Sequence, residues 1–510
     1  MKLSHRLPVL LSIFLSVLLA ACGGGGNDGA SGNEGGVVTA PTPPVTLRGT
    51  LISPASQVPQ VYAGASVATL SPAALSALLN ASFSGTTILT GNPTCSVTTY
   101  TAHYHTIDSQ GADTDASTAI MVPSGAAAAC NGARPVLLYA HGTSVLKSTD
   151  MADLSGSEPR LIAAIFAAEG YIVVAPNYAG YAGSSLPYTA YLDATQEASD
   201  MVDGLRAARA AFAGIGAGDS GQLYVSGYSQ GGHVALATQR AMQQGYPGEF
   251  RVTAAAGLSG PYALSLFGDT IFDGAPTIGS AAFVPLVINA GQRAGAQIYT
   301  STSDIYEDKY AAGIATLFPG TLGLGDLVAA GKLPDDVLFD SASLPQAPGY
   351  AAHFGADHLI KTAYRNGYLA DMAAHPCSTS NASPLSCAPA QPLRQWLVKN
   401  DLRNYLPSVP LLLCGGKDDP VVSFANADAT TAYFSAQGKA ANTLTELNID
   451  GTSLGPYSSE QLAFLAAKLA VQTAASLQGN DPDAAVQASY HAGLVAPFCL
   501  RSARDFFKTF

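Results

Sequence analysis

The stretch from Gln222 to Ala235 constrains this chain more than any other part of it. Its sequence, QLYVSGYSQGGHVA, places a short apolar run before G-Y-S-Q-G and a further glycine. The apolar run predicts a buried strand, and the Ala-rich segment from Val234 to Met242 predicts a helix. A serine on a sharp turn between strand and helix is the pattern of a nucleophile elbow, whose glycines allow close packing. The pattern exposes the Ser229 hydroxyl and directs the backbone N–H of Gln230 toward an oxyanion hole.

A second match to the short motif, from Gly451 to Gly455, has unsuitable neighbours. Chance matches are expected in a chain with 52 glycines. Pro456 and a polar Tyr-Ser-Ser-Glu run follow this match, where an elbow needs small residues that pack against a sheet. The match also leaves too little chain for an acidic residue on a strand before the last histidine. Ser229 is therefore the candidate nucleophile.

Strand and helix patterns alternate around the elbow. A β-rich pair of segments, Ser96 to Ile107 and Ser117 to Val122, predicts a hairpin near the start. The alternation predicts a mostly parallel sheet with helices on both faces, which is the α/β class. The segments that show it are strands at Pro135 to Ala140, Tyr171 to Ala175, Gln222 to Val225 and Val252 to Leu258, with helices at Glu158 to Glu169 and Tyr191 to Phe212.

The alternation stops near residue 266 and resumes near residue 401. The intervening stretch contains no buried strand run, so we expect an inserted, mainly helical cap. Its helical patterns lie at Ala281 to Gly295, Asp304 to Leu317 and His353 to Ala374. The sequence thus predicts a signal peptide at 1–21, a flexible tether at 22–45, a core in two parts at 46–265 and 401–510, and a cap at 266–400.

The N-terminus resembles a bacterial lipoprotein signal. Lys2, His5 and Arg6 precede an apolar run from Leu7 to Leu19, which is too short to span a membrane, and Leu-Ala-Ala-Cys22 follows. The resemblance implies cleavage before Cys22 and lipidation of that residue, with Gly23 favouring the outer membrane. Cleavage removes two positive charges, so the formal charge of −12 becomes −14. The acidic balance excludes the basic patch that nucleic-acid binding requires.

The six cysteines that follow Cys22 predict three disulfides, because their number is even and the expected compartment is oxidising. Proximity along the chain favours two of the pairs, Cys95–Cys130 and Cys377–Cys387, and leaves the last two cysteines as the third pair. None of the cysteines has metal-ligand spacing with a histidine, and His103 and His105 have no acidic partner at ligand spacing, so we expect no metal site. The pairs are Cys95–Cys130, Cys377–Cys387 and Cys414–Cys499.

The order of residues along the chain selects the remaining candidates for a serine hydrolase. Such an enzyme on this fold needs its nucleophile, acid and histidine in that order, and only one of the nine histidines, His491, follows the resumed strand at Pro410 to Cys414. The acid belongs on the turn after that strand, where Asp418 and Asp419 both qualify. The loop after the Pro135 to Ala140 strand would supply a second oxyanion donor, for which the Thr143 N–H is in place.

Taken together, the motifs resemble those of α/β-hydrolases of the secretory lipase type, including lipoprotein esterases, over residues 96–510. In that family the pattern Gly-x-x-Asp-x-x-Val carries the acid, which favours Asp419 because Val422 follows it by three. The family usually has Asp-Tyr where this chain has Asn177-Tyr178. The motifs in order are AHGT, VVAPNYAGYAGS, GYSQGG, GLSGPY, LLLCGGKDDPVV and YHAGLVAPFC.

The resemblance implies a carboxylic ester hydrolase that needs no cofactor and acts through Ser229, Asp419 and His491. It implies a cap that encloses an acyl pocket, and a small-molecule ester or lipid as substrate. We expect the anchor at Cys22 to hold the protein at the outer membrane, facing the periplasm or the cell surface, and infer no protein partner. A bond between Cys414 and Cys499 would hold the acid and histidine loops together.

Two other functions fit parts of the sequence. A peptidase of the prolyl-oligopeptidase kind shares the three catalytic residue types, but no run of blade-like repeats precedes the elbow. A surface binding protein on a hydrolase fold that has lost catalysis is the other alternative, since a fold does not determine a function. The complete set of three residues in the required order argues against it.

Overall fold

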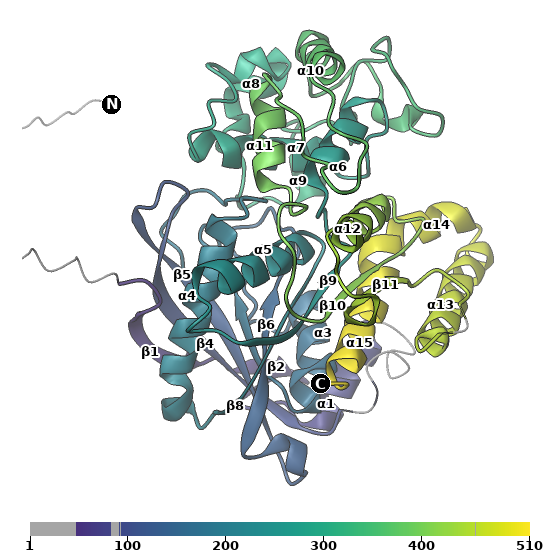
Figure 1. The fold of residues 1–510 in the computed structure, drawn as a ribbon. Helices are drawn as coiled ribbons and strands as arrows, with labels where there is room; N and C mark the ends of the chain where they lie inside the picture. The colour runs from purple at the N-terminus through teal and green to yellow at the C-terminus, as the bar shows by residue number, and fades with distance from the viewer. Residues whose placement is uncertain (1–46, 83–90, 92, 454) are drawn as a thin grey trace, which may run out of the picture. The chain divides into compact units, whose positions relative to one another are not determined.

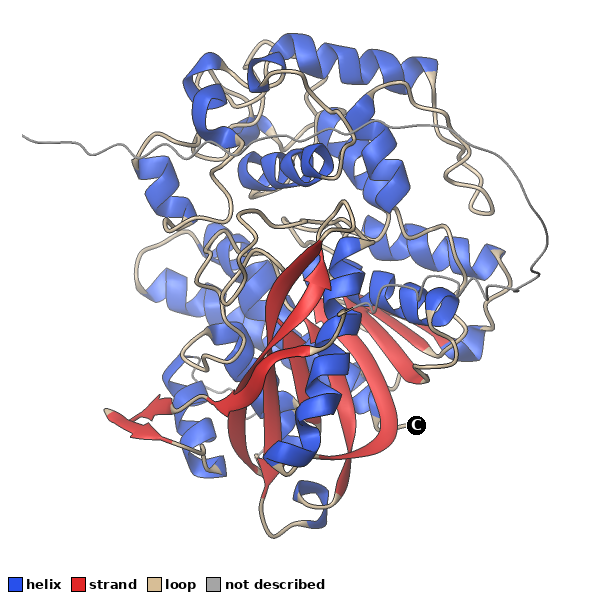
Figure 2. Ribbon diagram, turned by 90° about the vertical axis from the view of Figure 1, so that its left-hand side faces the viewer, coloured by secondary structure: helices blue, strands red, loops and turns tan. Residues whose placement is uncertain are grey.

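The computed structural model describes residues 47–82, 91, 93–453 and 455–510, and a nine-stranded sheet runs through this part of the chain (Figure 2). The strand order is β1-β4-β5-β7-β6-β8-β9-β10-β11. The strands from β7 onward pair in parallel, whereas β1, β4 and β5 are antiparallel to their neighbours, so the predicted α/β class is confirmed. Their bounds are β1 Leu51–Gln57, β4 Ser96–Ile107, β5 Asp113–Ser124, β6 Ala133–Ala140, β7 Ile172–Pro176, β8 Gly218–Tyr228, β9 Val252–Leu258, β10 Leu411–Gly415 and β11 Leu444–Asn448.

The central strands are apolar throughout because both faces of the sheet are covered. In β6, Leu137 and Tyr139 pack into one hydrophobic cluster, while Val136, Leu138 and Ala140 pack into the cluster on the opposite face. Each cluster is completed by helices that follow or precede the strands. One face is covered by α1 Pro72–Ser82, α3 Ser157–Ile165 and α15 Ala496–Phe507, and the other by α4 Gln196–Ala211, α5 Gln230–Gly245 and α12 Ala425–Ala436.

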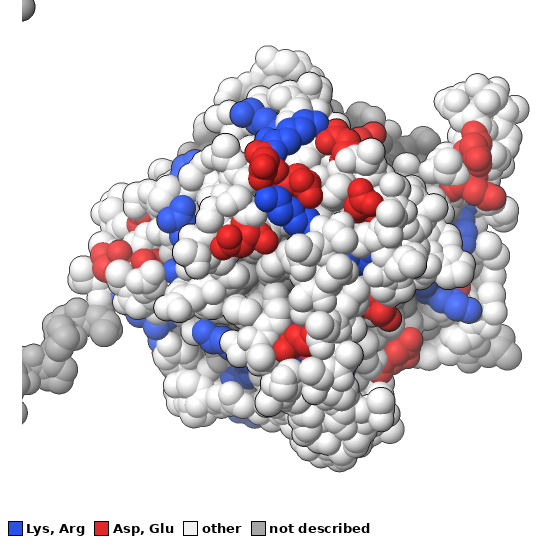
Figure 3. Space-filling view, turned by 90° about the horizontal axis from the view of Figure 1, so that it is seen from above, with Lys and Arg blue, Asp and Glu red and all other residues white. Residues whose placement is uncertain are grey.

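A layer of helices lies above the carboxyl end of the sheet (Figure 1). This cap layer comes from the chain between β9 and β10 and has a hydrophobic cluster of its own. Figure 3, which views the layer from above, shows acidic and basic side chains interspersed in a surface that is mostly uncharged. The helices of the cap layer are α6 Leu264–Phe272, α7 Ser280–Arg293, α8 Asp308–Ile314, α9 Leu324–Ala329, α10 Thr362–Ala374 and α11 Pro392–Asn400.

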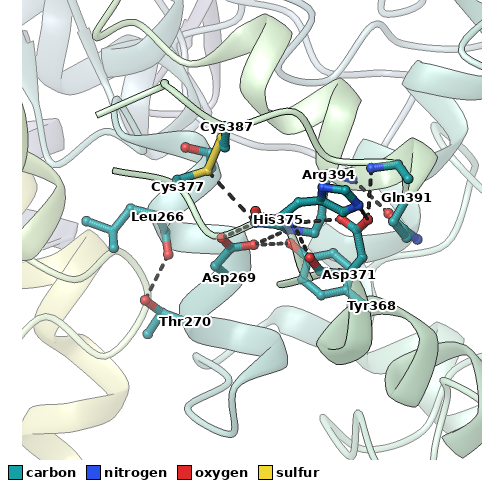
Figure 4. Close-up of polar contacts among 12 residues, drawn as sticks. Leu266, Asp269, Thr270, Tyr368, Asp371, His375, Cys377, Cys387, Gln391 and Arg394 are labelled. Carbon is teal, nitrogen blue, oxygen red and sulfur yellow. Dashed lines mark hydrogen bonds and ion pairs between the residues drawn. A yellow bond between two sulfur atoms is a disulfide. The ribbon is translucent and has the colours of Figure 1, made fainter. Parts of the chain in front are cut away.

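Arg394 joins three helices of the cap layer from within it (Figure 4). Its side chain is 2% exposed and donates to both carboxylate oxygens of Asp269 on α6, at 3.1 Å each. It also donates to Asp371 Oδ2 on α10 at 2.6 Å. A buried guanidinium is tolerated where carboxylates surround it in this way. The network therefore fixes α6, α10 and α11 relative to one another.

Three expected helices begin or end elsewhere. The helix expected from Tyr191 starts as α4 at Gln196, because Leu192 has a positive φ of 58° and the Asp193 carboxylate accepts the N–H groups of Thr195 and Gln196. The helix expected from His353 starts at Thr362, since the preceding segment makes strand-like bridges at Phe354 and Ile360. The helix expected at residues 304–317 is only the short α8.

Three disulfides join the expected pairs of cysteines. Cys95–Cys130, Cys377–Cys387 and Cys414–Cys499 are all formed. The third links the end of β10 to α15, which begins five residues after His491. It therefore connects the two segments that carry Asp419 and His491.

Removing the Cys414–Cys499 bond is expected to lower the free energy of unfolding by about 2–5 kcal/mol, since it closes a long loop of the unfolded chain. That loop spans 85 residues, against 10 for Cys377–Cys387. We expect Cys414→Ala with Cys499→Ala to lower kcat as well, whereas Cys377→Ala with Cys387→Ala leaves kcat unchanged. Denaturant unfolding and ester hydrolysis would measure both effects. An unchanged kcat in the first double variant would show that the bond does not hold the site.

No helix in the described ranges combines the length and the apolarity needed to cross a membrane. The two helices that precede His491 are α13 Ser458–Leu477 and α14 Pro482–Ser489. Cys22 and the expected signal peptide and tether lie outside the described residues.

The histidine pair on β4 corrects one expectation, because both histidines have acidic partners on β5. His103 Nε2 lies 2.8 Å from Asp115 Oδ2, and His105 Nδ1 lies 3.4 Å from Asp113 Oδ2. Both aspartates belong to β5, which begins earlier than expected.

Candidate active site

Ser229 occupies a strained turn between β8 and α5. Its φ of 59° and ψ of −124° are rare for a residue with a side chain and are typical of nucleophile elbows. The two motif glycines are required because the turn is so tight. A Cβ on Gly227 would lie 2.1 Å from the carbonyl oxygen of Gly231, and a Cβ on Gly231 would lie 2.0 Å from that of Ala140. The local sequence therefore dictates this backbone shape.

A continuous chain of hydrogen bonds connects Ser229, His491 and Asp419. The Nε2 atom of His491 lies 2.9 Å from Ser229 Oγ, and its Nδ1 atom lies 2.7 Å from Asp419 Oδ2. His491 stands on a π-helical turn, Tyr490–Val495, between α14 and α15; such turns are frequent at functional sites. This arrangement can draw the proton from the serine hydroxyl and hold the imidazole in one tautomer.

The structure separates the two acidic candidates. Asp419 is 6% exposed and contacts His491, whereas the Asp418 side chain is 67% exposed and lies 3.8 Å from Lys468 Nζ. Burial alone would raise the pKa of Asp419, but the adjacent His491 and the hydrogen bonds it receives lower the pKa below its ordinary value. Asp419 is thus held as a carboxylate beside the imidazole.

Two residues that sequence reasoning did not select complete this arrangement. Ser259, just after β9, donates to Asp419 Oδ2 at 2.7 Å. Tyr228 donates from its hydroxyl to the backbone oxygen of His491 at 2.5 Å. Ser259 lies in the motif GLSGPY and Tyr228 in GYSQGG. Neither the spacing nor the residue type predicts that they contact Asp419 and His491, which are far away in the sequence. These two hydrogen bonds help to fix the positions of Asp419 and His491 relative to Ser229.

The loop after β6 lies beside Ser229. A Cβ on Gly142 would be 3.7 Å from Ser229 Cβ, and the N–H of Gly142 donates to Glu158 Oε1 at 2.9 Å. Thr143 follows, with its hydroxyl 3.1 Å from that of Tyr191. Gln230 is the first residue of α5, where a backbone N–H has no partner within the helix. Both segments can therefore present N–H groups to an oxygen near Ser229.

Asn177, where the resembling family has aspartate, is buried and fully hydrogen-bonded. Its side-chain amide donates to Ser117 Oγ at 2.9 Å and to Asp150 Oδ1 at 3.0 Å. Its side-chain oxygen accepts the N–H of Met151 at 2.7 Å. The side chain of Asn177 therefore links Ser117, Asp150 and Met151, and Ser229 and His491 are not among the partners of these hydrogen bonds.

An apolar cavity opens from Ser229 into the cap layer. The space between its lining residues amounts to about 630 Å³, part of it open to solvent. Ser229 and Gln230 are among the residues that line it. The walls come mainly from the cap layer and are lined by Leu264, Phe267, Ile271, Phe272, Phe283, Val284, Val287, Leu393 and Leu397. Within the described ranges, no group of three or more His, Cys, Asp or Glu is placed to hold a metal ion.

Comparisons with known proteins agree with this fold. Residues 158–256 match the prolyl oligopeptidase family of peptidases, and this segment contains Ser229. No curated protein matches the chain in sequence. Among solved structures, the rice cell wall degrading esterase LipA from Xanthomonas oryzae is 27% identical, with a TM-score of 0.64, and the match covers 82% of this chain and 95% of LipA.

Two further structures extend the comparison. A ligand-bound form of LipA is 26% identical with a TM-score of 0.66, covering 90% of this chain and 98% of that one. A protein from Legionella pneumophila is 20% identical with a TM-score of 0.63, covering 89% of this chain and 97% of that one, and shares the fold. The chain is an α/β-hydrolase of the esterase and lipase type. It is an enzyme of the serine hydrolase class.

Proposed function

We propose that the protein is a carboxylic ester hydrolase that acts through Ser229, His491 and Asp419 and forms an acyl-enzyme. The observation that carries this proposal is the hydrogen-bonded chain from Asp419 through His491 to Ser229, which stands on a strained elbow and lines an apolar cavity. The similarity to an esterase over most of both chains supports the same reaction.

In the proposed reaction, Ser229 Oγ attacks the ester carbonyl carbon while His491 Nε2 takes the hydroxyl proton. The N–H groups of Gln230 and Thr143 stabilise the oxyanion of the tetrahedral intermediate. His491 then returns the proton to the departing alcohol, which leaves an acyl group on Ser229. Water, activated by His491, releases the acid, and Asp419 remains ionised throughout because it only orients and stabilises the imidazolium.

The cavity favours an apolar acyl group. Most of its lining residues are aliphatic or aromatic. Burying each methylene of an acyl chain there contributes about 0.8 kcal/mol. We therefore expect kcat/KM to rise with acyl length until the cavity is filled, and then to fall.

Hydrolysis of p-nitrophenyl esters from acetate to palmitate tests this expectation. A maximum at intermediate or long chains is the expected result. A steady decline from acetate onward would show that the cavity does not take the acyl group. Esters attached to plant cell wall polysaccharide form a further arm of the assay, because LipA is a cell wall degrading esterase.

A peptidase is the second candidate, because residues 158–256 match the prolyl oligopeptidase family. A Ser229 variant cannot separate a peptidase from an esterase, because both would lose activity in it. Hydrolysis of peptide p-nitroanilides distinguishes the two. Cleavage of peptides with no hydrolysis of any ester would reverse the two proposals. If the folded protein hydrolysed neither esters nor peptides and also failed to react with a fluorophosphonate, the result would favour a binding protein.

We also propose that Cys22 is lipidated and anchors the protein at the outer membrane. The N-terminal sequence motivates this, and the three disulfides support an oxidising compartment outside the cytoplasm. Labelling with radioactive palmitate in a bacterial host, beside Cys22→Ser, tests it. Label retained in the variant, or soluble wild-type protein, would refute the proposal.

A further inference from the structure

The carboxyl group of Glu197 is buried against the residue that follows Ser229. Glu197 is the second residue of α4 and is 0% exposed. Its Oε1 atom accepts a hydrogen bond from Gln230 Nε2 at 2.5 Å. The side chain of Gln230, which is also buried, is therefore tethered from a neighbouring helix at the first residue of α5.

The two remaining polar atoms of this pair have no hydrogen-bond partner among the described residues. They are Glu197 Oε2 and Gln230 Oε1. If Glu197 were ionised, both atoms would be acceptors and neither could satisfy the other, which is unfavourable for buried polar groups. A protonated carboxyl carries one O–H donor, so the acid O–H can donate to the amide oxygen while the amide N–H donates to the acid oxygen.

The electrostatic surroundings favour the same protonation state. Burial raises the pKa of Glu197 well above its usual range. The hydrogen bonds from Gln230 and from the backbone N–H of Leu192 lower this pKa, whereas Asp193, just before α4, and Asp200, on α4, raise it. The tyrosines whose hydroxyl groups interact with this carboxyl come from the loop between β7 and α4, and they are Tyr178, Tyr181 and Tyr191.

We propose that Glu197 is a positioning residue: as a neutral carboxylic acid it holds Gln230 in a two-point acid–amide pair and so keeps the Gln230 N–H directed at the oxyanion. An oxyanion donor is effective only when it is held in place before the reaction, because its reorganisation then costs nothing at the transition state. The inference rests on the proposed function above, in which this N–H stabilises the tetrahedral intermediate.

Two substitutions of Glu197 test the role. Glu197→Gln offers the same donor and acceptor to Gln230, so kcat is expected to stay within a few-fold of the wild type. Glu197→Ala removes the pair, and we expect kcat to fall by about 10- to 100-fold, part of the loss that follows removal of a whole oxyanion donor, with KM little changed. If Glu197→Gln were as slow as Glu197→Ala, a carboxylate would be required and the proposal would be wrong.

The pH dependence gives a second readout of the same pair. The neutral acid is the active form, so raising the pH through the pKa of the folded state ionises Glu197 and lowers kcat on the alkaline side. Glu197→Gln has no such group, and its kcat is expected to hold to higher pH than that of the wild type. An identical alkaline decline in both proteins would contradict this role.

Infrared spectroscopy reports the protonation state without any substrate. The difference between wild type and Glu197→Gln at neutral pH is expected to contain the C=O stretch of a protonated carboxyl. If this band is absent, the inference is wrong even if ester hydrolysis is confirmed. If the band is present, the neutral state of Glu197 is established even if the proposed function fails. The two proposals can therefore fail separately.

Asp203 provides a matched control on the same helix. It is also 0% exposed, but it pairs with Arg48 and Arg206, at 2.8 and 2.7 Å, away from Ser229. Asp203→Asn is expected to lower the melting temperature without changing kcat. A loss of kcat equal to that of Glu197→Ala would show that any loosening of α4 impairs catalysis, and that Glu197 has no special role.

Discussion

Ser229→Ala is expected to lower kcat for ester hydrolysis by about 10⁴- to 10⁶-fold, because it removes the atom that forms the acyl-enzyme. The substitution keeps the Cβ, so it adds no strain at a φ of 59° and leaves the elbow folded. His491 loses its partner at 2.9 Å but keeps its bond to Asp419. Steady-state hydrolysis of the preferred p-nitrophenyl ester, with labelling by a fluorophosphonate, measures the loss.

Ser453 supplies the matched control, since it is the serine of the second, rejected motif. It lies in the loop after β11, and its hydroxyl donates to Gln461 Oε1 at 2.9 Å. Ser453→Ala is expected to retain full activity and full labelling. If Ser229→Ala still reacted with the fluorophosphonate at the wild-type rate, the nucleophile would have to lie elsewhere.

Asp419→Asn is expected to lower kcat by about 10⁴-fold while leaving the protein folded. The amide of an asparagine would present a donor to the Nδ1–H of His491, so the imidazole would turn to the other tautomer and could no longer accept the serine proton. The lowered pKa of Asp419 shows that the folded protein favours the ionised form that asparagine lacks. Activity across neutral pH, with a melting temperature for each variant, measures the effect.

Asp418→Asn is the control, because it makes the same chemical change one residue earlier. The Asp418 side chain is exposed and lies 3.8 Å from Lys468, beyond hydrogen-bonding distance. An exposed charge of this kind contributes little, so we expect kcat to stay within about twofold of the wild type. If Asp418→Asn were the more damaging variant, the assignment of the acid would be reversed.

The elements near the elbow could be predicted from sequence because their signals are local. The apolar runs of β6 to β10 follow from strands that are buried on both faces, and the glycines around Ser229 follow from a turn that tolerates no Cβ. The cap layer was harder to predict, because its short helices and extended segments are stabilised by packing such as the Arg394 network and by isolated bridges. Helix boundaries there depend on partners far away in the chain.

The sequence by itself determined the α/β-hydrolase fold, the disulfide pairs and the candidates Ser229 and His491, because chain order and short-range patterns carry that information. Only the tertiary structure places Asp419, and not Asp418, against His491, and only it brings Ser259 and Glu197 close to these residues. Ser259 meets Asp419 across 160 residues, and Glu197 meets Gln230 across 33. Such contacts depend on how the strands are ordered in the sheet and how helices pack on it, and no local pattern of residues encodes them.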